Sequence, residues 1–510
     1  MSSLVPLYVI LPLVSAFLIP ILSKWVKGFH KAMLTLVLLF LTILTFYIIF
    51  SGMDQPVAYQ VGGWEPVEGV PIAIYLVLDG LSAFLLLIVS LIGLAASSYA
   101  ISYIKRYTAE QNFYALLSLM IAGMNGVVLT GDMFNLYVFL EIAVIASYAL
   151  VAFGIEKTEL EASFKYQVLG GLASLLILLA IGMLYWKTHT LNMADISRVL
   201  AQGESDIFLT FTQILLISGF GLKAAMIPFH AWLPDAHSSA PAPISAMLSG
   251  VLIKAVGIYA LMRLFFNMFA ITYEISLVIT IIGALSMVIG VFLAIGQWDL
   301  KRLLAYHSIS QMGYVVIGVG MGMMVLAKGG DRSVAALAIA GGLFHMINHA
   351  VFKGLLFLNA GAIEYITGTR NLKMMGGLFK SLPVTSTTSL GASLSISGIP
   401  PFNGFFSKLI IIVAAIQGGF YLLAVLAVVV SIVTLASFMK FQRYAFFNKK
   451  TFSRKIREVP FFMSLSMVVL VIFCLALSLL IFPGIREVVL TPAVDVLMES
   501  TNYATIITGM

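Results

Sequence analysis

Two lysines lie on either side of a proline-rich interruption in the apolar stretch 218–259. Lys223 belongs to the first apolar run, which is broken at Pro228, and Lys254 belongs to the second. A lysine in the middle of a lipid-embedded helix is costly, so such residues are rare and usually functional. We therefore expect a path for a proton or an ion at this point of the chain.

One carboxylate, Glu141, is predicted to lie as deep in its span as these lysines, about 12 Å in at ~1.5 Å per residue. An unpaired charge at that depth is very costly, so Glu141 and Lys223 form the expected ion pair. Lys353 and Lys408 also fall within predicted spans. One glutamate cannot neutralise four lysines. This surplus favours proton transfer over the alternative of a purely structural ion pair.

The intramembrane cations are all lysines, and none is an arginine. Burial lowers the pKa of a lysine from ~10.4 by as much as about 3–5 units, and a nearby carboxylate raises it again. A buried lysine can therefore load or release a proton, whereas arginine stays protonated. The choice of residue favours titration over a fixed charge.

Two histidines and a lysine share one predicted helix. His345, His349 and Lys353 are spaced at i, i+4 and i+8 and should line one face through about two turns. Imidazoles can both donate and accept protons near neutral pH, as a relay requires. A zinc site is the rival interpretation, but the HxxxH pair lacks the glutamate of HExxH and a third ligand, so we expect no metal. A hydrogen-bonded packing pair is the other alternative.

A second proline break, at Pro400-Pro401, precedes Lys408. Proline frees backbone carbonyls that need water or side chains, so hydration is expected there. Further polar residues lie near the cytoplasmic ends of the predicted spans. They are either a route for proton uptake or ordinary polar loop residues, and the sequence leaves both interpretations open. These candidates are His230, Asp235, His237 and His307.

Hydrophobic residues make up 61% of the 510 positions and charged residues only 10%. A soluble domain carries about 25% charged residues, so the composition predicts an all-α polytopic membrane protein. A span needs roughly 17–25 apolar residues. On that criterion we predict 14 transmembrane helices, near 4–22, 33–50, 80–101, 113–130, 133–153, 164–186, 207–228, 242–266, 273–296, 303–326, 334–362, 383–417, 420–447 and 460–482.

Charge in the loops predicts the orientation. With the N-terminus outside, the cytoplasmic loops carry roughly three times as many Lys and Arg residues as the outer loops, as the positive-inside rule requires. We therefore predict that both termini are outside, that 440–458 is a basic cytoplasmic loop, and that Arg263 is one of few outer cations. The outer loops are acidic, with Asp54, Glu65, Glu68, Asp79, Asp195, Glu204 and Asp206.

A short internal similarity links the two breaks, Ile227-Pro-Phe-His-Ala-Trp232 and Ile399-Pro-Pro-Phe-Asn-Gly-Phe405. Broken helices at corresponding places in two halves are typical of transporters built from repeats. The predicted parts are 1–112 (helices 1–3), 113–266 (first repeat), 267–447 (second repeat) and 448–510 (basic loop, last helix and tail).

The lone cysteine, Cys474, excludes an internal disulfide and a cysteine-ligated cluster, so we expect no cofactor and no redox chemistry on this chain. The net charge of +7 arises mainly from loops between spans and indicates orientation in the membrane, not a nucleic-acid site.

Several stretches together resemble one family. They are LVLDGLSAF at 76–84, LYVFLEIAVIASYAL at 136–150, KAAMIPFHAWLPDAHSSAPAPISAMLSGVLIKAVGIY at 223–259, DLKRLLAYHSISQMGY at 299–314, HMINHAVFKGLLFLNAG at 345–361 and GIPPFNGFFSK at 398–408. The chain resembles the antiporter-like subunits shared by complex I, Mrp-type cation/proton antiporters and energy-converting membrane-bound hydrogenases. Its length and motif wording are most similar to the H-type subunit of such a hydrogenase or of a related sulfur-reducing complex.

The resemblance implies two inverted five-helix repeats, with the seventh and twelfth helices broken around a hydrated axis at mid-membrane. It implies that Glu141 and Lys223 are a coupling pair and Lys254 a connecting lysine. It further implies relay roles for His345 and His349 and a terminal role for Lys408, while Lys353 matches the family pattern without a defined role.

The leading hypothesis is a proton-translocating subunit of a redox-driven complex in the cell membrane. Its expected partners are other membrane subunits, peripheral Ni-Fe or iron–sulfur subunits, and lipid, and the transported ion is H⁺ with Na⁺ as an addition. The second hypothesis is a D-like subunit of an Mrp-type Na⁺/H⁺ antiporter. A third makes the chain a passive scaffold with a structural Glu141–Lys223 pair.

Overall fold

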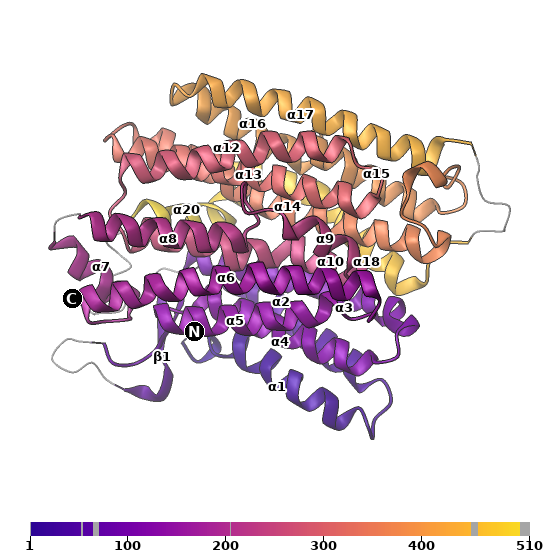
Figure 1. Cartoon of the computed structure of the whole chain (residues 1–510), viewed down its shortest axis with the longest axis horizontal. Coiled ribbons are helices and arrows are strands. Elements are labelled where there is room, and N and C mark those ends of the chain that lie inside the picture. The colour runs from indigo at the N-terminus through magenta and orange to yellow at the C-terminus, as the bar shows by residue number, and fades with distance from the viewer. Residues whose placement is uncertain (1, 53–54, 65–70, 204–205, 450–456, 500–510) are drawn as a thin grey trace.

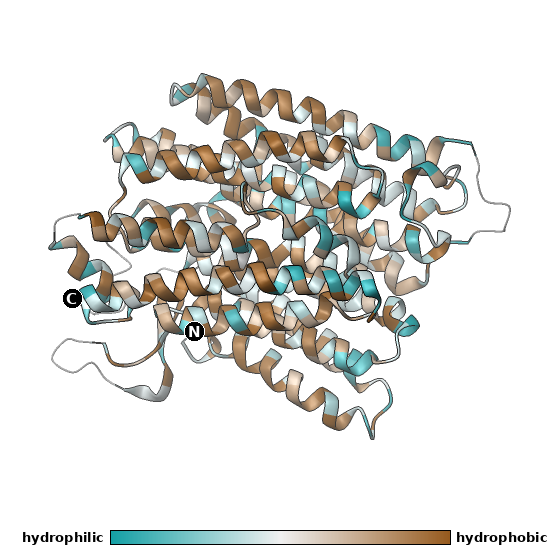
Figure 2. Cartoon of the chain, viewed as in Figure 1, coloured by the Kyte–Doolittle hydropathy of each residue, from teal (hydrophilic) through white to brown (hydrophobic). Residues whose placement is uncertain are grey.

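Apolar runs form the helices that the hydropathy predicts, and these helices lie side by side across the view, with α1 and α17 at opposite edges (Figure 1). The computed structural model describes residues 2–52, 55–64, 71–203, 206–449 and 457–499. Within this part of the chain, 12 helical runs are long and apolar enough to cross a membrane. Brown, apolar residues cover the middle of the outer helices, and teal, polar residues gather towards their ends (Figure 2).

The long helices are α1 (Leu7–Leu22), α2 (Phe29–Ser51), α3 (Gly80–Tyr103), α4 (Glu110–Leu129), α5 (Met133–Val151), α6 (Lys157–Thr188), α12 (Tyr273–Ile295), α13 (Leu300–Ala327), α14 (Arg332–Thr367), α17 (Tyr421–Gln442) and α18 (Phe461–Ala476). One continuous run combines α10 (Ala242–Met247), the π-helical segment η4 (Leu248–Tyr259) and α11 (Ala260–Asn267).

Shorter elements complete the fold. The helices are α7 (Met193–Ala201), α8 (Ile207–Lys223), α9 (Trp232–Ser239), α15 (Pro383–Ser397), α16 (Asn403–Gln417), α19 (Pro483–Val489) and α20 (Thr491–Met498). Short 3₁₀ or π turns are η1 (Ser2–Leu4), η2 (Val61–Gly63), η3 (Ile104–Arg106), η5 (Leu372–Met374), η6 (Arg443–Phe447) and η7 (Leu477–Ile481). The strands β1 (Val57–Gln60) and β2 (Tyr75–Leu78) pair antiparallel, with Val57 opposite Leu78.

Two apolar helices are interrupted at the predicted prolines. The chain leaves helical structure after α8, passes Pro228 and resumes as α9. It does so again between α15 and α16, around Pro400-Pro401. Each interruption lies beside a buried lysine, Lys223 in the first and Lys408 in the second.

Acidic residues begin several of these helices. An aspartate side chain at the N-terminus of a helix accepts a hydrogen bond from a free backbone N–H and suits the positive end of the helix dipole. Such caps start α3, α5, α8, α13 and α14, at Asp79, Asp132, Asp206, Asp299 and Asp331. Two of the aspartates predicted to lie in acidic outer loops, Asp79 and Asp206, are therefore the residues at which helices begin.

The bundle has a face that we call the basic face, where ion pairs join the ends of α6, α9 and α13. Asp235 lies 2.5 Å from Arg302 and 3.2 Å from Lys165, atom to atom. On the same face, the ammonium groups of Lys373 and Lys440 lie 4.5 and 4.9 Å from the centre of the Trp298 ring. Loops that the sequence assigns to one side therefore do meet on one side.

Some predictions need correction or extension. The predicted all-α fold is confirmed, and the described residues add to it only the short β1–β2 hairpin. The predicted list of spans omits the amphipathic helix α7. The predicted helix 334–362 ends too early, because α14 continues to Thr367 and includes Glu364. Arg263, counted among the outer cations, lies buried on α11 at the end of its predicted span. Several predicted loop residues and ranges lie outside the described residues, namely Asp54, Glu65, Glu68, Glu204, 450–456 and 500–510.

Arg263 forms a buried bidentate ion pair with Asp79. Its two terminal nitrogens lie 2.7 and 2.9 Å from the two carboxylate oxygens, and it also donates to the Tyr259 hydroxyl. Both charged side chains are at most 3% exposed. Asp79 also caps α3, so this pair ties the start of α3 to α11.

Removal of one partner from this pair should destabilise the bundle strongly. Arg263→Met leaves Asp79 buried without its counter-charge, a loss of about 3–5 kcal/mol. The surface pair Lys187–Asp206 is the matched control, because solvent screens it and Lys187→Met should therefore lower stability much less. Thermal unfolding in detergent compares the two variants, and equal losses would contradict this account of the buried pair.

Candidate functional site

Glu141, Ser174 and Lys223 form a polar cluster contributed by α5, α6 and α8. The Lys223 ammonium donates a hydrogen bond to the Ser174 hydroxyl (2.8 Å) and lies 3.6 Å from a Glu141 carboxylate oxygen. The Ser174 hydroxyl in turn donates to Glu141. The Lys223 side chain is buried, whereas the Glu141 side chain is 25% exposed at the side of the bundle. A serine therefore bridges the ion pair expected from the sequence.

The break after α8 fixes the position of Lys223. Helix ends leave carbonyl oxygens without partners inside the helix, and a cation at this end is favoured by the helix dipole. The Trp232 indole donates to the Leu222 carbonyl (3.0 Å), and the Ile227 amide donates to the Ser286 hydroxyl (2.9 Å). The non-helical turn is thus held by side chains, and the ammonium stays inside the bundle.

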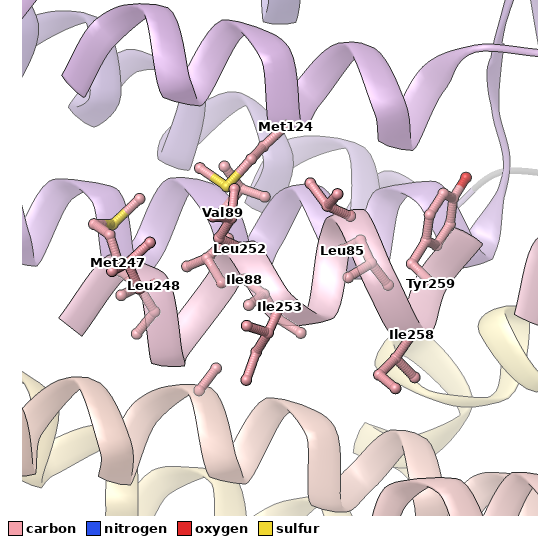
Figure 3. Close-up of a cluster of buried hydrophobic side chains, with 14 of the residues drawn as sticks. Leu85, Ile88, Val89, Met124, Met247, Leu248, Leu252, Ile253, Ile258 and Tyr259 are labelled. Carbon is pink, nitrogen blue, oxygen red and sulfur yellow. The ribbon is translucent and has the colours of Figure 1, made fainter. Parts of the chain in front are cut away.

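Lys254 lies in the π-helical segment η4. Its side chain is fully buried, and its ammonium donates to the Ser249 carbonyl at 2.5 Å. Apolar side chains such as Ile88, Met124 and Leu252 gather around the helical run that carries it (Figure 3). Single π-helical turns occur often at functional sites, and here the irregular turn supplies the acceptor.

A chain of hydrogen bonds leads from Lys254 to Lys353. The Ser249 hydroxyl lies 2.7 Å from the Ser308 hydroxyl of α13. Ser308 donates to the Leu304 carbonyl (3.1 Å), and the Lys353 ammonium donates to that same carbonyl. The two lysines are therefore linked through polar atoms of η4 and α13.

His345 connects α14 to α13 and α16. Its Nδ1 lies 2.9 Å from the Ser407 hydroxyl, and its Nε2 lies 3.2 Å from the Gln311 amide oxygen. Its ring centre is 5.3 Å from that of Tyr314. Since Ser407 directly precedes Lys408, this histidine reaches the second interrupted helix.

His349 lies one turn further along α14. It is fully buried and interacts electrostatically with Lys254, Lys353, His345 and His237. Neither of its ring nitrogens has a protein hydrogen-bond partner in the described structure. His349 therefore has ionisable neighbours on several helices and is not held by a fixed protein hydrogen bond.

Lys408 uses a carbonyl that the second break releases. Gly398, at the end of α15, adopts a φ of +76°, which favours glycine. The Lys408 ammonium donates to the Ile396 carbonyl (2.7 Å) and lies 4.9 Å from the centre of the Tyr314 ring. The freed backbone acceptor expected at this proline break is thus taken by the lysine itself.

The predicted residues fall into three hydrogen-bonded groups. In the described residues, one group contains Lys223 and Glu141, a second connects Lys254 with Lys353, and a third connects His345 with the residue beside Lys408, with no hydrogen bond between the groups. The first two groups nevertheless approach each other through backbone. A Cβ at Gly257 of η4 would lie 2.6 Å from the Ala224 Cβ, so α8 and η4 approach very closely.

The four candidate uptake residues lie in different surroundings. Asp235 forms its ion pairs on the basic face, and His230 is half-buried in the turn between α8 and α9. His307 is buried, with its Nε2 2.8 Å from the Ser437 hydroxyl. His237 is buried with its ring stacked on Phe357 at 4.8 Å between centres. The sequence grouping of His230, Asp235 and His237 is therefore divided between surface and core.

Sequence reasoning missed the serines that link these charges, Ser174, Ser249 and Ser407. Serine is common in apolar helices, so its type carries little information. The only available signal was proximity to a lysine, which applies to Ser407. Within the described residues, no group of three or more His, Cys, Asp or Glu side chains is arranged to hold a metal ion.

These features define a class of protein, namely a polytopic membrane protein with ionisable side chains gathered between interrupted helices. The family model described as NADH:quinone oxidoreductase/Mrp antiporter, TM, matches residues 130–434, and the chain belongs to this family. The family predicted from the motifs is thereby confirmed. The chain is an antiporter-like membrane subunit of the kind found in Mrp and complex I-like assemblies.

Two curated relatives show the range of the family. The chain is 35% identical over 460 residues to the D-type subunit of the Na⁺/H⁺ antiporter of Alkalihalophilus pseudofirmus, covering 88% of each protein. It is 37% identical over 391 residues to the N-type subunit of the NADH-quinone oxidoreductase of Desulforudis audaxviator, covering 76% of this chain and 74% of that one.

Solved structures share the whole fold. A chain of the Mrp complex from Dietzia sp. superposes with a TM-score of 0.89 at 27% identity, covering 100% of this chain and 99% of that one. A chain of an archaeal membrane-bound sulfane sulfur reductase gives a TM-score of 0.88 at 28% identity, covering 99% of each. The antiporter-like fold therefore extends along the entire chain.

Loss of the bridging serine should destabilise the protein more than loss of an ordinary buried serine. Ser174→Ala removes hydrogen bonds to two charged groups, each worth about 1.5–3 kcal/mol. Ser163 is the matched control on α6, because among the described residues its hydroxyl bonds to one neutral group, the Tyr148 carbonyl, and Ser163→Ala should cost about 1 kcal/mol. Thermal unfolding measures both, and an equal or smaller loss at position 174 would contradict the bridge.

Proposed function

We propose that this chain is the proton-translocating membrane subunit of a larger, redox-driven complex of the membrane-bound hydrogenase or complex I-like kind. Protons would move along the row Glu141, Lys223, Lys254, His345, His349, Lys353 and Lys408. The observation that carries the proposal is that three buried lysines hydrogen-bond to backbone carbonyls and, among the described residues, not to carboxylates. In the part of the chain that is described, Lys254, Lys353 and Lys408 donate to backbone carbonyls and none of them forms an ion pair.

A carbonyl acceptor holds an ammonium group but does not neutralise its charge. An uncompensated buried charge costs several kcal/mol, and a lysine can avoid that cost by releasing its proton. Arginine has no such option. Lysines bonded only to carbonyls are therefore suited to alternate between charged and neutral forms as protons pass.

The energy would arrive as a change in the separation of Glu141 and Lys223. Moving one charge against 100 mV costs about 2.3 kcal/mol. One pKa unit corresponds to ~1.36 kcal/mol, so a change of about two units per transfer is of the right order. Ser174 contacts both charges in the observed arrangement, so a change in their separation would have to break at least one of its hydrogen bonds.

The topology belongs to the same proposal. If α8 with α9 and α15 with α16 each count as one broken span, they add the seventh and twelfth helices to the 12 long ones. The two inverted repeats would then be 113–266 and 267–447. We further propose that the basic face is cytoplasmic, that both termini are outside, and that the membrane is the cell membrane.

Partners follow from the exposed side of the cluster. Glu141 faces the side of the bundle among exposed apolar residues that include Phe134 and Ile145. A carboxylate that is 25% exposed at that depth suits contact with another membrane subunit rather than with lipid. The redox groups, of Ni-Fe or iron–sulfur type, would reside on peripheral partners, because this chain supplies no cysteine cluster.

The 35% identity to a D-type Na⁺/H⁺ antiporter subunit over 88% of both chains favours a second candidate. In that case the chain is a D-like subunit of a multisubunit Mrp-type antiporter and no redox partner exists. Purification of the intact complex separates the two candidates. Ni-Fe or iron–sulfur subunits among the co-purifying polypeptides support the first, and a set of membrane antiporter subunits alone supports the second.

Replacement of the bridged lysine tests proton movement itself. Lys223→Ala should abolish coupled proton movement in proteoliposomes while the complex still assembles, and Glu141→Gln should have the same effect. Lys328→Ala, which removes an exposed lysine at the end of α13, is the control and should leave the rate unchanged. Full pumping by the Lys223 variant would refute the proposal. Loss of stability without loss of transport in Glu141→Gln would instead support a scaffold role.

A further inference from the structure

A polar cavity of about 720 Å³ opens on the basic face. It lies where the ends of α3, α6, α9, α13 and α14 meet, and its lining is rich in ionisable side chains. The ionisable residues of the lining include Arg106, Glu159, Lys301, Glu364 and Arg370. A cavity of this size and polarity admits water deep into the end of the bundle.

An ion pair separates this cavity from the core. Glu364 lies 2.9 Å from Lys301, and the Glu364 side chain is 21% exposed while that of Lys301 is 2% exposed. The carboxylate therefore reaches the cavity and the ammonium lies behind it. Lys301 also donates to the Ala240 carbonyl (3.1 Å), and Arg370 approaches the other Glu364 oxygen at 3.8 Å.

His237 lies three residues before Ala240, whose carbonyl accepts a hydrogen bond from Lys301. The His237 side chain is fully buried, and neither ring nitrogen has a protein hydrogen-bond partner in the described structure. An unsatisfied buried polar group costs about 1–3 kcal/mol, so its retention needs an explanation. The charged groups that face it electrostatically are Lys301, Lys254 and Lys353.

Phe357 of α14 contacts both His237 and Lys353, and so relates His237 to the cavity at one end of α14 and to the buried lysines at the other. On α14, Glu364 follows Lys353 by three turns, about 16 Å at ~1.5 Å per residue. Phe357 lies between them, and its ring contacts His237 at 4.8 Å on one side and the Lys353 ammonium at 5.4 Å. The imidazole therefore lies beside α14 in the interval between Glu364 and Lys353.

We propose that Glu364 and Lys301 form the uptake site for protons from the basic face, and that His237 carries each proton onward to Lys353. A proton from cavity water binds the Glu364 carboxylate and weakens its ion pair. Lys301 then gives a proton to the neutral His237 imidazole and is reprotonated by Glu364. His237 passes its proton to neutral Lys353, so each uptake group returns to its starting form and one proton has moved inward.

This inference rests on the proposed function, and its first test uses the purified complex in proteoliposomes. Glu364→Gln and His237→Phe should each slow proton movement about a hundredfold, within the range that a positioned acid or base contributes. Glu161→Gln is the control, because Glu161 is an exposed carboxylate on the same face, paired with Lys165. It should transport at the normal rate.

Outcomes separate the two proposals. Suppose that Lys223→Ala stops transport but that Glu364→Gln and His237→Phe transport at the normal rate. The uptake route is then overturned, and the proposed function of the chain in proton translocation is retained. If Lys223→Ala also transports normally, both are overturned. Assembly of each variant is checked by its co-purifying subunits.

A second measurement does not depend on how well these variants fold. Ser239 lines the cavity, and the only native cysteine, Cys474, is buried. In Ser239→Cys, a membrane-impermeant, thiol-reactive sulfonate added from the basic-face side should stop transport, whereas the same reagent from the other side should not. The unsubstituted chain should resist the reagent from both sides. Unchanged transport after complete labelling at position 239 would overturn the uptake route.

Discussion

An ammonium group buried between apolar helices needs hydrogen-bond acceptors, and in this bundle the helices provide them at irregular turns or through neighbouring carbonyls. Lys408 takes the Ile396 carbonyl beside the second break, and Lys254 takes the Ser249 carbonyl inside a π-helical segment. Lys223 ends α8 at the first break. The second interruption is therefore part of the site, because Pro400 has no N–H to donate to the Ile396 carbonyl, which a regular helix would have used internally.

The consequence is a set of charges that are hydrogen-bonded but only partly compensated. Glu141 balances Lys223 through Ser174, whereas carbonyls and serines support the lysines beyond it. Such groups respond strongly to a change at a neighbour, since little water or counter-charge screens them. The close approach of Gly257 to Ala224 gives a physical route for such a change, because the end of α8 packs directly on η4 there.

Much of this arrangement could be predicted because charge stands out against an apolar background. The lysines, the i, i+4, i+8 spacing on α14 and both proline breaks are visible in the sequence itself. Ser174 and Ser249 are not, because only the packing of α6 on α8 and of η4 on α13 gives them partners.

The errors at helix ends have a common cause. Hydropathy falls before α14 stops, which leaves Glu364 outside the predicted helix, and Lys301 resembles a solvated loop charge although Glu364 covers it. A lone arginine near a span end usually faces water, but the partner of Arg263 lies 184 positions away in the sequence, beyond the reach of local patterns.

The central claim is that these lysines exchange protons rather than act as fixed charges. The most direct measurement is proton movement by Lys408→Arg in the intact complex, with thermal stability and subunit content checked alongside. Arginine keeps the positive charge and can donate to the Ile396 carbonyl, but it does not release its proton. We predict that transport is lost as completely as in Lys408→Met, with assembly retained. Normal transport by the arginine variant would contradict the account.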